Sequence, residues 1–132
     1  MIQDGDTGVL TGGSTESPAT TKVSRYSRSG LEKYLPSLNT GRYRHGCSSL
    51  EIGEKIVSQA LLIMTFQNDI LTWPPIQAYV VVGGLDISNN RLASTELLIT
   101  GEAAWKRVGP LPVAVRDLRA TTVQNIVYAT GE

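Results

Sequence analysis

The feature that most constrains the fold of this chain is an internal repeat. Residues 31–36 (Leu-Glu-Lys-Tyr-Leu-Pro) align with residues 105–110 (Trp-Lys-Arg-Val-Gly-Pro) at an offset of 74, and the same offset places Arg42 on Arg116. Chance similarity rarely keeps its register through a strand, a proline turn and the next strand. We therefore interpret the sequence as that of a repeat protein, in which each unit covers its neighbour.

Glycine landmarks give the period of the repeat. Short apolar runs end in glycine at three places: Gly12-Gly13, Gly83-Gly84 and Gly131-Glu132. Gly83 follows Gly12 at an offset of 71, whereas Gly131 follows Gly83 at an offset of 48. Segment 57–77 has no counterpart in the other copies, and removing it shortens the first offset to 50. The sequence thus predicts a unit of about 50 residues with one insertion.

The order of these motifs resembles the kelch-repeat β-propeller family. In that family an apolar strand ends in a glycine pair, and a further strand, a Trp, a proline turn, an Arg and the next inner strand follow. The second copy offers Val80-Val81-Val82-Gly83-Gly84, a strand with Glu96, then Trp105, Pro110-Leu111-Pro112, Arg116 and Arg119-Ala120. The first copy departs from the family at Leu31, where Trp is usual. The resemblance covers nearly the whole chain except 57–77.

This resemblance implies an all-β fold, namely a partial β-propeller with an antiparallel four-stranded blade between partial neighbours. Residues 1–35 would form strands two to four of one blade. Residues 36–109 would form a full blade that carries the insertion 57–77, and residues 110–132 the inner hairpin of a third blade. We expect the strands of the full blade at 46–51, 78–82, 95–100 and 104–108.

Particular residues are expected to hold such blades together. The unbroken apolar run 79–82 is typical of a strand that is covered on both faces. The glycine pairs would turn the backbone with positive φ or pass close to a neighbouring strand. Trp105 would fill the space between adjacent blades, and Pro110 would lie in an irregular link where a missing N–H breaks no ladder. Gly131 marks the corresponding strand end of the third copy.

Segment 57–77 has two interpretations. It is either a natural long loop of the hairpin between Glu51 and Ala78, or a translated intron. Lengthening a hairpin loop to about 25 residues costs only about 2 kcal/mol of closure entropy. The intron hypothesis rests on codons, because Val57-Ser58 can be encoded GTAAGT and Gln77 can be encoded CAG, which match splice-site sequences. Excision between these points removes whole codons, so it keeps the reading frame and also restores the repeat period.

Composition excludes several classes of function. Lys plus Arg equals Asp plus Glu at 12 each, so no net charge attracts nucleic acid or an anionic membrane. The one membrane-like run, 60–66, is far shorter than the roughly 20 residues that span a bilayer. A single cysteine, Cys47, cannot form an internal disulfide, which favours an intracellular, cytoplasmic location.

No catalytic, cofactor-binding or metal-binding group is predicted. His45 is the only histidine, and we expect it to pack and hydrogen-bond at the start of an inner strand. It and Cys47 would share one face of that strand, but a nucleophile pair needs a third, orienting group that the sequence does not offer.

Four arginines enter the inner strands: Arg42, Arg44, Arg116 and Arg119. In one interpretation Arg42 and Arg116 make hydrogen bonds between blades, to carbonyls or to a carboxylate such as Glu96. In the other, the arginines line the mouth of the propeller and pair with the carboxylates of an acidic peptide.

The favoured function is that of a protein–protein interaction scaffold, whose partner proteins the sequence does not identify. The alternative is a fragment of a propeller enzyme similar to galactose oxidase, with its catalytic residues outside this chain. A chain with partial blades leaves sheet edges and faces uncovered, so we also expect it to self-associate when expressed alone.

Overall fold

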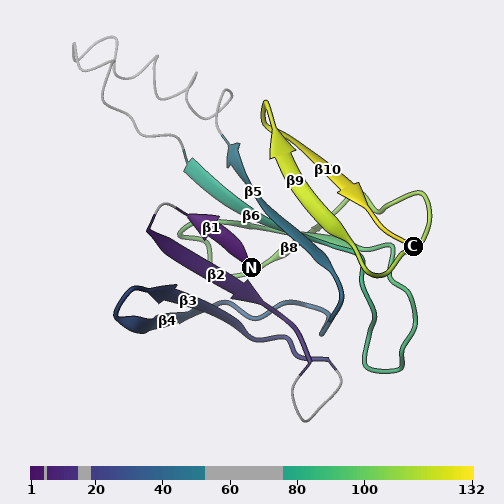
Figure 1. The fold of residues 1–132 in the computed structure, drawn as a ribbon, viewed down its shortest axis with the longest axis horizontal. Helices are drawn as coiled ribbons and strands as arrows, with labels where there is room; N and C mark the ends of the chain where they lie inside the picture. Colours follow the sequence, from purple (N-terminus) through teal and green to yellow (C-terminus); the bar gives the residue numbers. More distant parts are fainter. Residues whose placement is uncertain (5, 15–18, 53–75) are drawn as a thin grey trace.

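The computed structural model describes residues 1–4, 6–14, 19–52 and 76–132, and in these residues every regular element is a β-strand (Figure 1). The strands are β1 (Ile2–Asp4), β2 (Thr7–Thr11), β3 (Val23–Ser27), β4 (Gly30–Leu35), β5 (Gly46–Ile52), β6 (Ile76–Val82), β7 (Thr95–Ile99), β8 (Lys106–Val108), β9 (Arg119–Val123) and β10 (Ile126–Thr130). The all-β fold class is confirmed.

Three antiparallel sheets follow one another along the chain. The first sheet has the order β1-β2-β3-β4, the second β5-β6-β7-β8, and the third consists of β9 and β10. Within each sheet, every strand pairs with the strands next to it in the sequence, so each sheet is a meander. The first sheet contains one more strand than the three that the sequence indicated, because residues 2–4 pair with β2.

The two expected inner hairpins are present. In the third sheet, Gln124 and Asn125 form the two-residue turn with φ values of 49° and 60°, the left-handed conformation that asparagine tolerates in such hairpins. In the second sheet, β5 pairs with β6 over their whole length. Ile76 and Gln77, which we assigned to the insertion, lie in β6, and the rest of segment 57–77 is outside the described residues.

The hydrogen bonds of the first sheet recur in the second. Four pairs of backbone hydrogen bonds match at offsets between 71 and 73: Gly12 N–H to Lys22 O and Gly83 N–H to Ser94 O, Gly13 N–H to Arg42 O and Gly84 N–H to Val115 O, Leu38 N–H to Thr21 O and Leu111 N–H to Ala93 O, and Arg42 N–H to Thr20 O and Val115 N–H to Leu92 O. The two copies therefore share one backbone plan.

This backbone plan moves the alignment of the arginines by one residue. Arg42 bridges to Thr20, and Val115 makes the equivalent bridge to Leu92. The offset here is 73 rather than 74, so Arg42 corresponds to Val115 and not to Arg116. The sequence alignment matched residue types, whereas the position of a residue in a sheet is fixed by backbone hydrogen bonds.

Both glycine pairs adopt positive φ, as expected: 56° and 108° at Gly12 and Gly13, and 58° and 98° at Gly83 and Gly84. Crowding adds a second reason for glycine, because a Cβ atom on Gly12 would lie 2.5 Å from the Arg42 carbonyl oxygen. At Gly131 only the crowding applies, since a Cβ there would lie 2.8 Å from the Arg116 carbonyl oxygen.

Strand β6 is buried on both faces, which confirms the expectation for its apolar run. Tyr79 and Val81 belong to a core cluster with residues of the first sheet, whereas Val80 and Val82 pack in a second cluster with residues of the third. The first cluster comprises Ile2, Val9, Val23, Leu38, Tyr79, Val81, Leu98 and Trp105. The second sheet is thus the middle layer of three.

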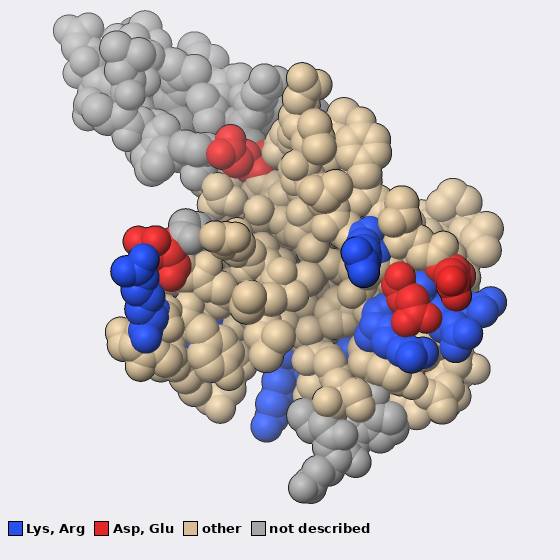
Figure 2. Space-filling view, viewed as in Figure 1, with Lys and Arg blue, Asp and Glu red and all other residues tan. Residues whose placement is uncertain are grey.

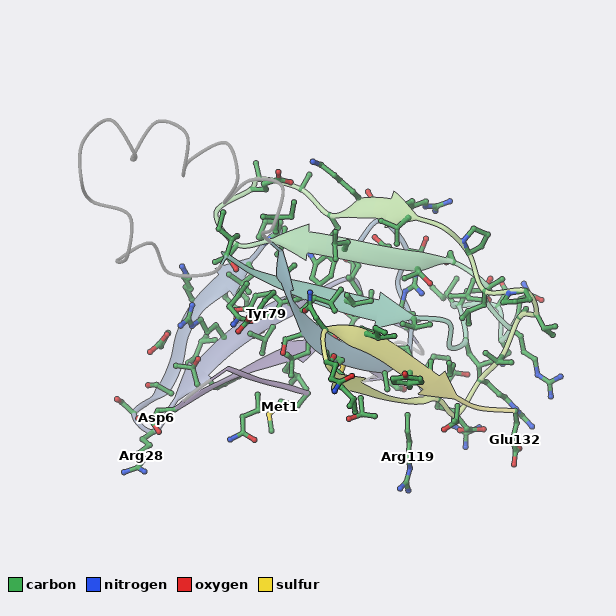
Figure 3. All side chains as sticks on the ribbon, turned by 90° about the horizontal axis from the view of Figure 1, so that it is seen from above. Met1, Asp6, Arg28, Tyr79, Arg119 and Glu132 are labelled. Carbon is green, nitrogen blue, oxygen red and sulfur yellow. The ribbon has the colours of Figure 1, made fainter. Side chains whose placement is uncertain are left out.

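The first strands of the sheets lie side by side in the order β1, β5, β9. Direct bonds join β5 to the hairpin of β9: Ser48 Oγ lies 2.6 Å from Thr122 Oγ1. The Asn125 side chain accepts the N–H of Glu51 at 2.8 Å and donates to its carbonyl oxygen at 2.7 Å. In Figure 3, where the molecule is seen from above, β9 and β10 lie against β5.

Trp105 has the position that the sequence predicted between two sheets. It is only 3% exposed, and its Nε1–H donates to the Pro36 carbonyl oxygen at 2.7 Å. We expect Trp105→Ala to lower the free energy of unfolding by about 3–5 kcal/mol, because a large cavity replaces a packed indole. Urea melts measure the change.

The matched control is Trp73→Ala, since Trp73 belongs to the proposed insertion. We expect this change to alter the free energy of unfolding by less than about 0.5 kcal/mol. Equal losses at both tryptophans would mean that the insertion contributes to the core and that the repeat boundaries are misplaced.

Candidate partner-binding surface

Arg42 stands at the centre of the joint between the first and second sheets. Its side chain is fully buried. Nη1 donates to the carbonyl oxygens of Gly83 and Ser94 at 2.9 and 3.0 Å, and Nη2 donates to Ser94 Oγ at 3.0 Å and to Glu96 Oε2 at 2.8 Å. The link after β4 is thereby tied to the end of β6, to the loop that follows it and to β7.

Glu96 completes this joint from the opposite side. The buried carboxylate accepts the backbone N–H of Asn39 at 2.6 Å and that of Thr40 at 3.3 Å. Burial lowers the pKa of Arg42, while the neighbouring Glu96 charge opposes the shift. Because the two charges compensate each other and nearly all of their polar atoms are bonded, the pair is tolerated away from water.

The interpretation of Arg42 as a residue that hydrogen-bonds between sheets is therefore what the structure supports. The guanidinium is enclosed and already bonded, so Arg42 cannot reach a partner. Arg42 therefore does not belong to the predicted arginine surface. Glu96, which we named as a structural position of the repeat, is its charged counterpart.

A double-mutant cycle tests this joint. We expect Glu96→Leu to lower the free energy of unfolding by about 3–5 kcal/mol, because it leaves a buried guanidinium without its counter-charge. The double change Arg42→Met with Glu96→Leu should lower it by clearly less than the sum of the two single changes, since no uncompensated charge remains. Strict additivity in urea melts would contradict the coupling.

His45 lies next to this joint and has the packing role that the sequence indicated. Its Nε2 is 2.8 Å from Thr11 Oγ1, and within the described part of the chain Nδ1 has no hydrogen-bond partner. Burial, with a further contribution from the Arg42 charge, lowers the pKa of His45 to about 4. The imidazole is therefore neutral at pH 7.

This lowered pKa makes the stability depend on pH. The unfolded chain binds a proton at His45 near pH 6.5, and the folded chain only near pH 4, so the stabilisation is complete above pH 6.5 and is lost as the pH falls towards 4. The shift corresponds to a loss of about 3 kcal/mol. Urea melts at pH 7 and pH 4 should show this loss in the wild type, and a smaller one in His45→Gln, which has no imidazole to protonate.

Arg44 and Arg116 are the arginines that the fold brings together. Arg44 Nε lies 3.2 Å from Asp117 Oδ1, and Arg116 Nε lies 3.5 Å from Asp117 Oδ2. All three side chains are exposed to solvent, Arg44 by 53%. Arg44 and Asp117 occupy equivalent positions of the repeat and both have left-handed backbones, with φ of 54° and 52°. Figure 2 shows basic and acidic side chains gathered on the side of the molecule where the C-terminal end lies in Figure 1.

Arg119 lies apart from this cluster. It is exposed at the start of β9, and Figure 3 shows its side chain pointing away from the sheet into solvent, separate from Glu132. Of the four arginines predicted to form one surface, one is buried, two meet at Asp117 and one is separate. We call Arg44, Arg116 and Asp117 the arginine cluster.

Tyr43, the residue before Arg44, bonds to a loop that the sequence did not indicate. The Tyr43 hydroxyl donates to Asn89 Oδ1. Asn89 belongs to a tight loop in which Asp86 Oδ1 accepts the N–H groups of Asn90 and Ser88 at 2.9 and 2.8 Å, and these bonds lower the pKa of Asp86. Asp117 could have been noted because it follows Arg116 directly. The Tyr43–Asn89 contact joins two distant parts of the sequence and had no local signal.

The chemistry available in this region is that of ionic recognition. In the described ranges, no group of three or more His, Cys, Asp or Glu side chains could hold a metal ion.

No helix of the described residues is long and apolar enough to cross a membrane.

Comparison with known proteins adds no assignment. No protein-family model matches the chain, and no curated protein sequence matches it.

Proposed function

We propose that the chain is part of a kelch-type β-propeller that serves as a protein–protein interaction scaffold and has no catalytic role. The observation that carries this proposal is the repeated joint: two sheets share one plan of backbone hydrogen bonds, and the first strands of three successive sheets lie side by side. Blades around a propeller axis are arranged in this way. The proposed blades are residues 1–35, 36–109 and 110–132.

The arginine cluster is the proposed contact for a partner protein. Both ion pairs to Asp117 use the Nε atoms, so within the described residues the Nη groups of Arg44 and Arg116 remain available to a carboxylate. Exposed ion pairs contribute only about 0–1 kcal/mol, and rearranging Asp117 therefore costs little. Two guanidinium groups beside each other favour the binding of an acidic peptide segment, because a guanidinium binds a carboxylate in bidentate fashion.

The proposed cellular location and the excluded classes of partner rest on the cysteine content and the charge of the chain. The single cysteine has no disulfide partner, which favours the cytoplasm as the setting of the scaffold. The balanced charge of the chain gives neither nucleic acid nor a membrane surface a general attraction. No cofactor is needed for recognition of this kind.

Binding of a Gly-Ser peptide with a central Glu-Glu pair tests the proposal. In fluorescence anisotropy at low ionic strength, we expect Arg44→Gln combined with Arg116→Gln to weaken binding at least about tenfold, since truncating charge pairs at a contact costs about 1 kcal/mol or more.

The control is Arg28→Gln combined with Lys33→Gln, which removes the same charge from the first sheet. Arg28 lies at the opposite end of the molecule from Glu132 (Figure 3). This control should change affinity by less than about twofold, as expected for charges more than a Debye length away. Equal losses in both double variants would indicate attraction to net charge and would contradict a specific contact.

A further inference from the structure

The arginine cluster already contains a carboxylate of its own chain. Asp117 lies between the two arginines, with Oδ1 3.2 Å from Arg44 Nε and Oδ2 3.5 Å from Arg116 Nε. One carboxylate group thus contacts two guanidinium groups, with one oxygen atom toward each. A carboxylate of a partner must therefore either displace Asp117 or share the guanidinium groups with it.

Backbone contacts fix Asp117 beside Arg44. The N–H of Leu118, the residue that follows Asp117, donates to the Arg44 carbonyl oxygen at 3.3 Å. The two segments stay in close contact beyond this bond, because a Cβ atom on Gly46 would lie 3.2 Å from Leu118 Cβ. The Asp117 carboxylate is consequently held next to Arg44 by two joined segments.

The second sheet, whose four strands are all present, shows which residues of this segment stay exposed. The loop after β6 accepts a hydrogen bond from the Tyr43 hydroxyl through Asn89, yet the Arg44 side chain remains 53% exposed. Asp117 is the equivalent of Arg44 in the repeat. The corresponding loop of a third blade would therefore face Arg116, the equivalent of Tyr43, and would leave the Arg44–Asp117 pair open.

The fold does not require these two side chains. Both positions have left-handed backbones, with φ of 54° at Arg44 and 52° at Asp117, a conformation that glycine adopts at no steric cost and arginine only with strain. An ion pair between exposed side chains contributes little to stability, so stability does not explain an arginine where glycine would suit the backbone. Strain of this kind is concentrated at binding sites, and a role in recognition does explain it.

Asp117 opposes the binding of a single carboxylate in two ways. Because it is tethered beside the arginines, it competes at an effective concentration on the order of millimolar. A lone carboxylate that displaces it replaces one anion by another and gains no ion pair, and one that shares the arginines meets a like charge. Two carboxylates on one peptide escape this balance, because each can pair with its own guanidinium group.

We propose that Asp117 is an internal competitor of the partner, and that it restricts the arginine cluster to segments with at least two acidic residues. Asp117 then determines the specificity, whereas Arg44 and Arg116 supply the attraction. This role of Asp117 rests on the function proposed above, and it explains how the arginine cluster rejects single carboxylates.

Two labelled Gly-Ser peptides of equal length test this role, one with a central Glu-Glu pair and one with a central Glu-Gln pair. In anisotropy titrations against the whole chain, the wild type should bind the Glu-Glu peptide at least about fivefold more tightly than the Glu-Gln peptide. Asp117→Asn should bind the Glu-Gln peptide at least about fivefold more tightly than the wild type does, and its preference for Glu-Glu should fall to about twofold. An unchanged preference would overturn the proposal, and so would weaker binding of both peptides, since Asp117 would then orient the arginines.

Two further variants locate the effect. Asparagine tolerates the left-handed backbone and removes only the charge; Asp117→Gly removes the same carboxylate, also permits this conformation, and should reproduce the result. Urea melts should show both variants folded. Adding Arg44→Gln to Asp117→Asn should abolish the gain in affinity, and a gain that persists in this double variant would contradict the assignment to the arginine cluster.

The control for net charge is Glu32→Gln. This change breaks another exposed pair of an arginine and a carboxylate, in which Arg25 Nε lies 3.2 Å from Glu32 Oε2 in the first sheet. It should alter the affinity for either peptide by less than about twofold, because the charge is far from the arginine cluster. Gains equal to those of Asp117→Asn would reflect net charge and would overturn the proposal.

The titrations separate failure of this role from failure of the proposed function. If the wild type binds the Glu-Glu peptide and Asp117→Asn keeps the same preference, the arginine cluster is a binding site and the role of Asp117 is wrong. If neither protein binds either peptide, the function proposed for the arginine cluster is wrong, and the role of Asp117 is wrong with it.

Discussion

The buried ion pair of Arg42 and Glu96 is the interaction on which the arrangement of the first two sheets depends. One guanidinium bonds to the end of β6, to the loop that follows and to β7, and the carboxylate fixes two backbone N–H groups of the link at 39–40. Segments from three parts of the sequence thus share one network. A network of this kind is favourable only when its members are bonded together, so the link, the loop and β7 must be in place at once.

The glycine pairs and the tryptophan serve the same joint. Glycine at position 12 allows a close approach to the Arg42 carbonyl group, since a Cβ there would lie 2.5 Å from the carbonyl oxygen. Trp105 packs on the same joint, and its carbonyl oxygen accepts a hydrogen bond from Asn39 Nδ2 at 2.9 Å. The close backbone approach at Gly12, the packed Trp105 ring and the buried charge pair therefore stabilise the same joint. The second joint has Val115 in place of Arg42, with the same backbone bonds, and an apolar cluster that includes Leu118.

Much of this fold could be predicted from the sequence, because landmark residues have local causes. Glycine pairs mark strand ends through positive φ, Gln124-Asn125 marks a tight turn, and the apolar run at 79–82 marks a strand with two covered faces. The register of the link could not be predicted to the residue, since proline and arginine matched by type at 74 while the backbone repeats at 73 there. The four arginines do not form one surface, because Arg42 is enclosed by its bonding partners and Arg119 points elsewhere. Such partners are distant in sequence and leave no local signal.

The attachment of the third sheet has a consequence for its dynamics. Hairpins of two strands are marginally stable in water. The β9–β10 hairpin relies on the packing of Val127 and Ala129 against the cluster of Val80, Val82 and Leu118, on the Ser48–Thr122 bond and on the Asn125 bridge to Glu51. The first two sheets, by contrast, share one core of buried side chains that runs from Ile2 to Trp105. The amide protons of β9 and β10 are therefore expected to exchange with water sooner than those of β6, which is covered on both faces.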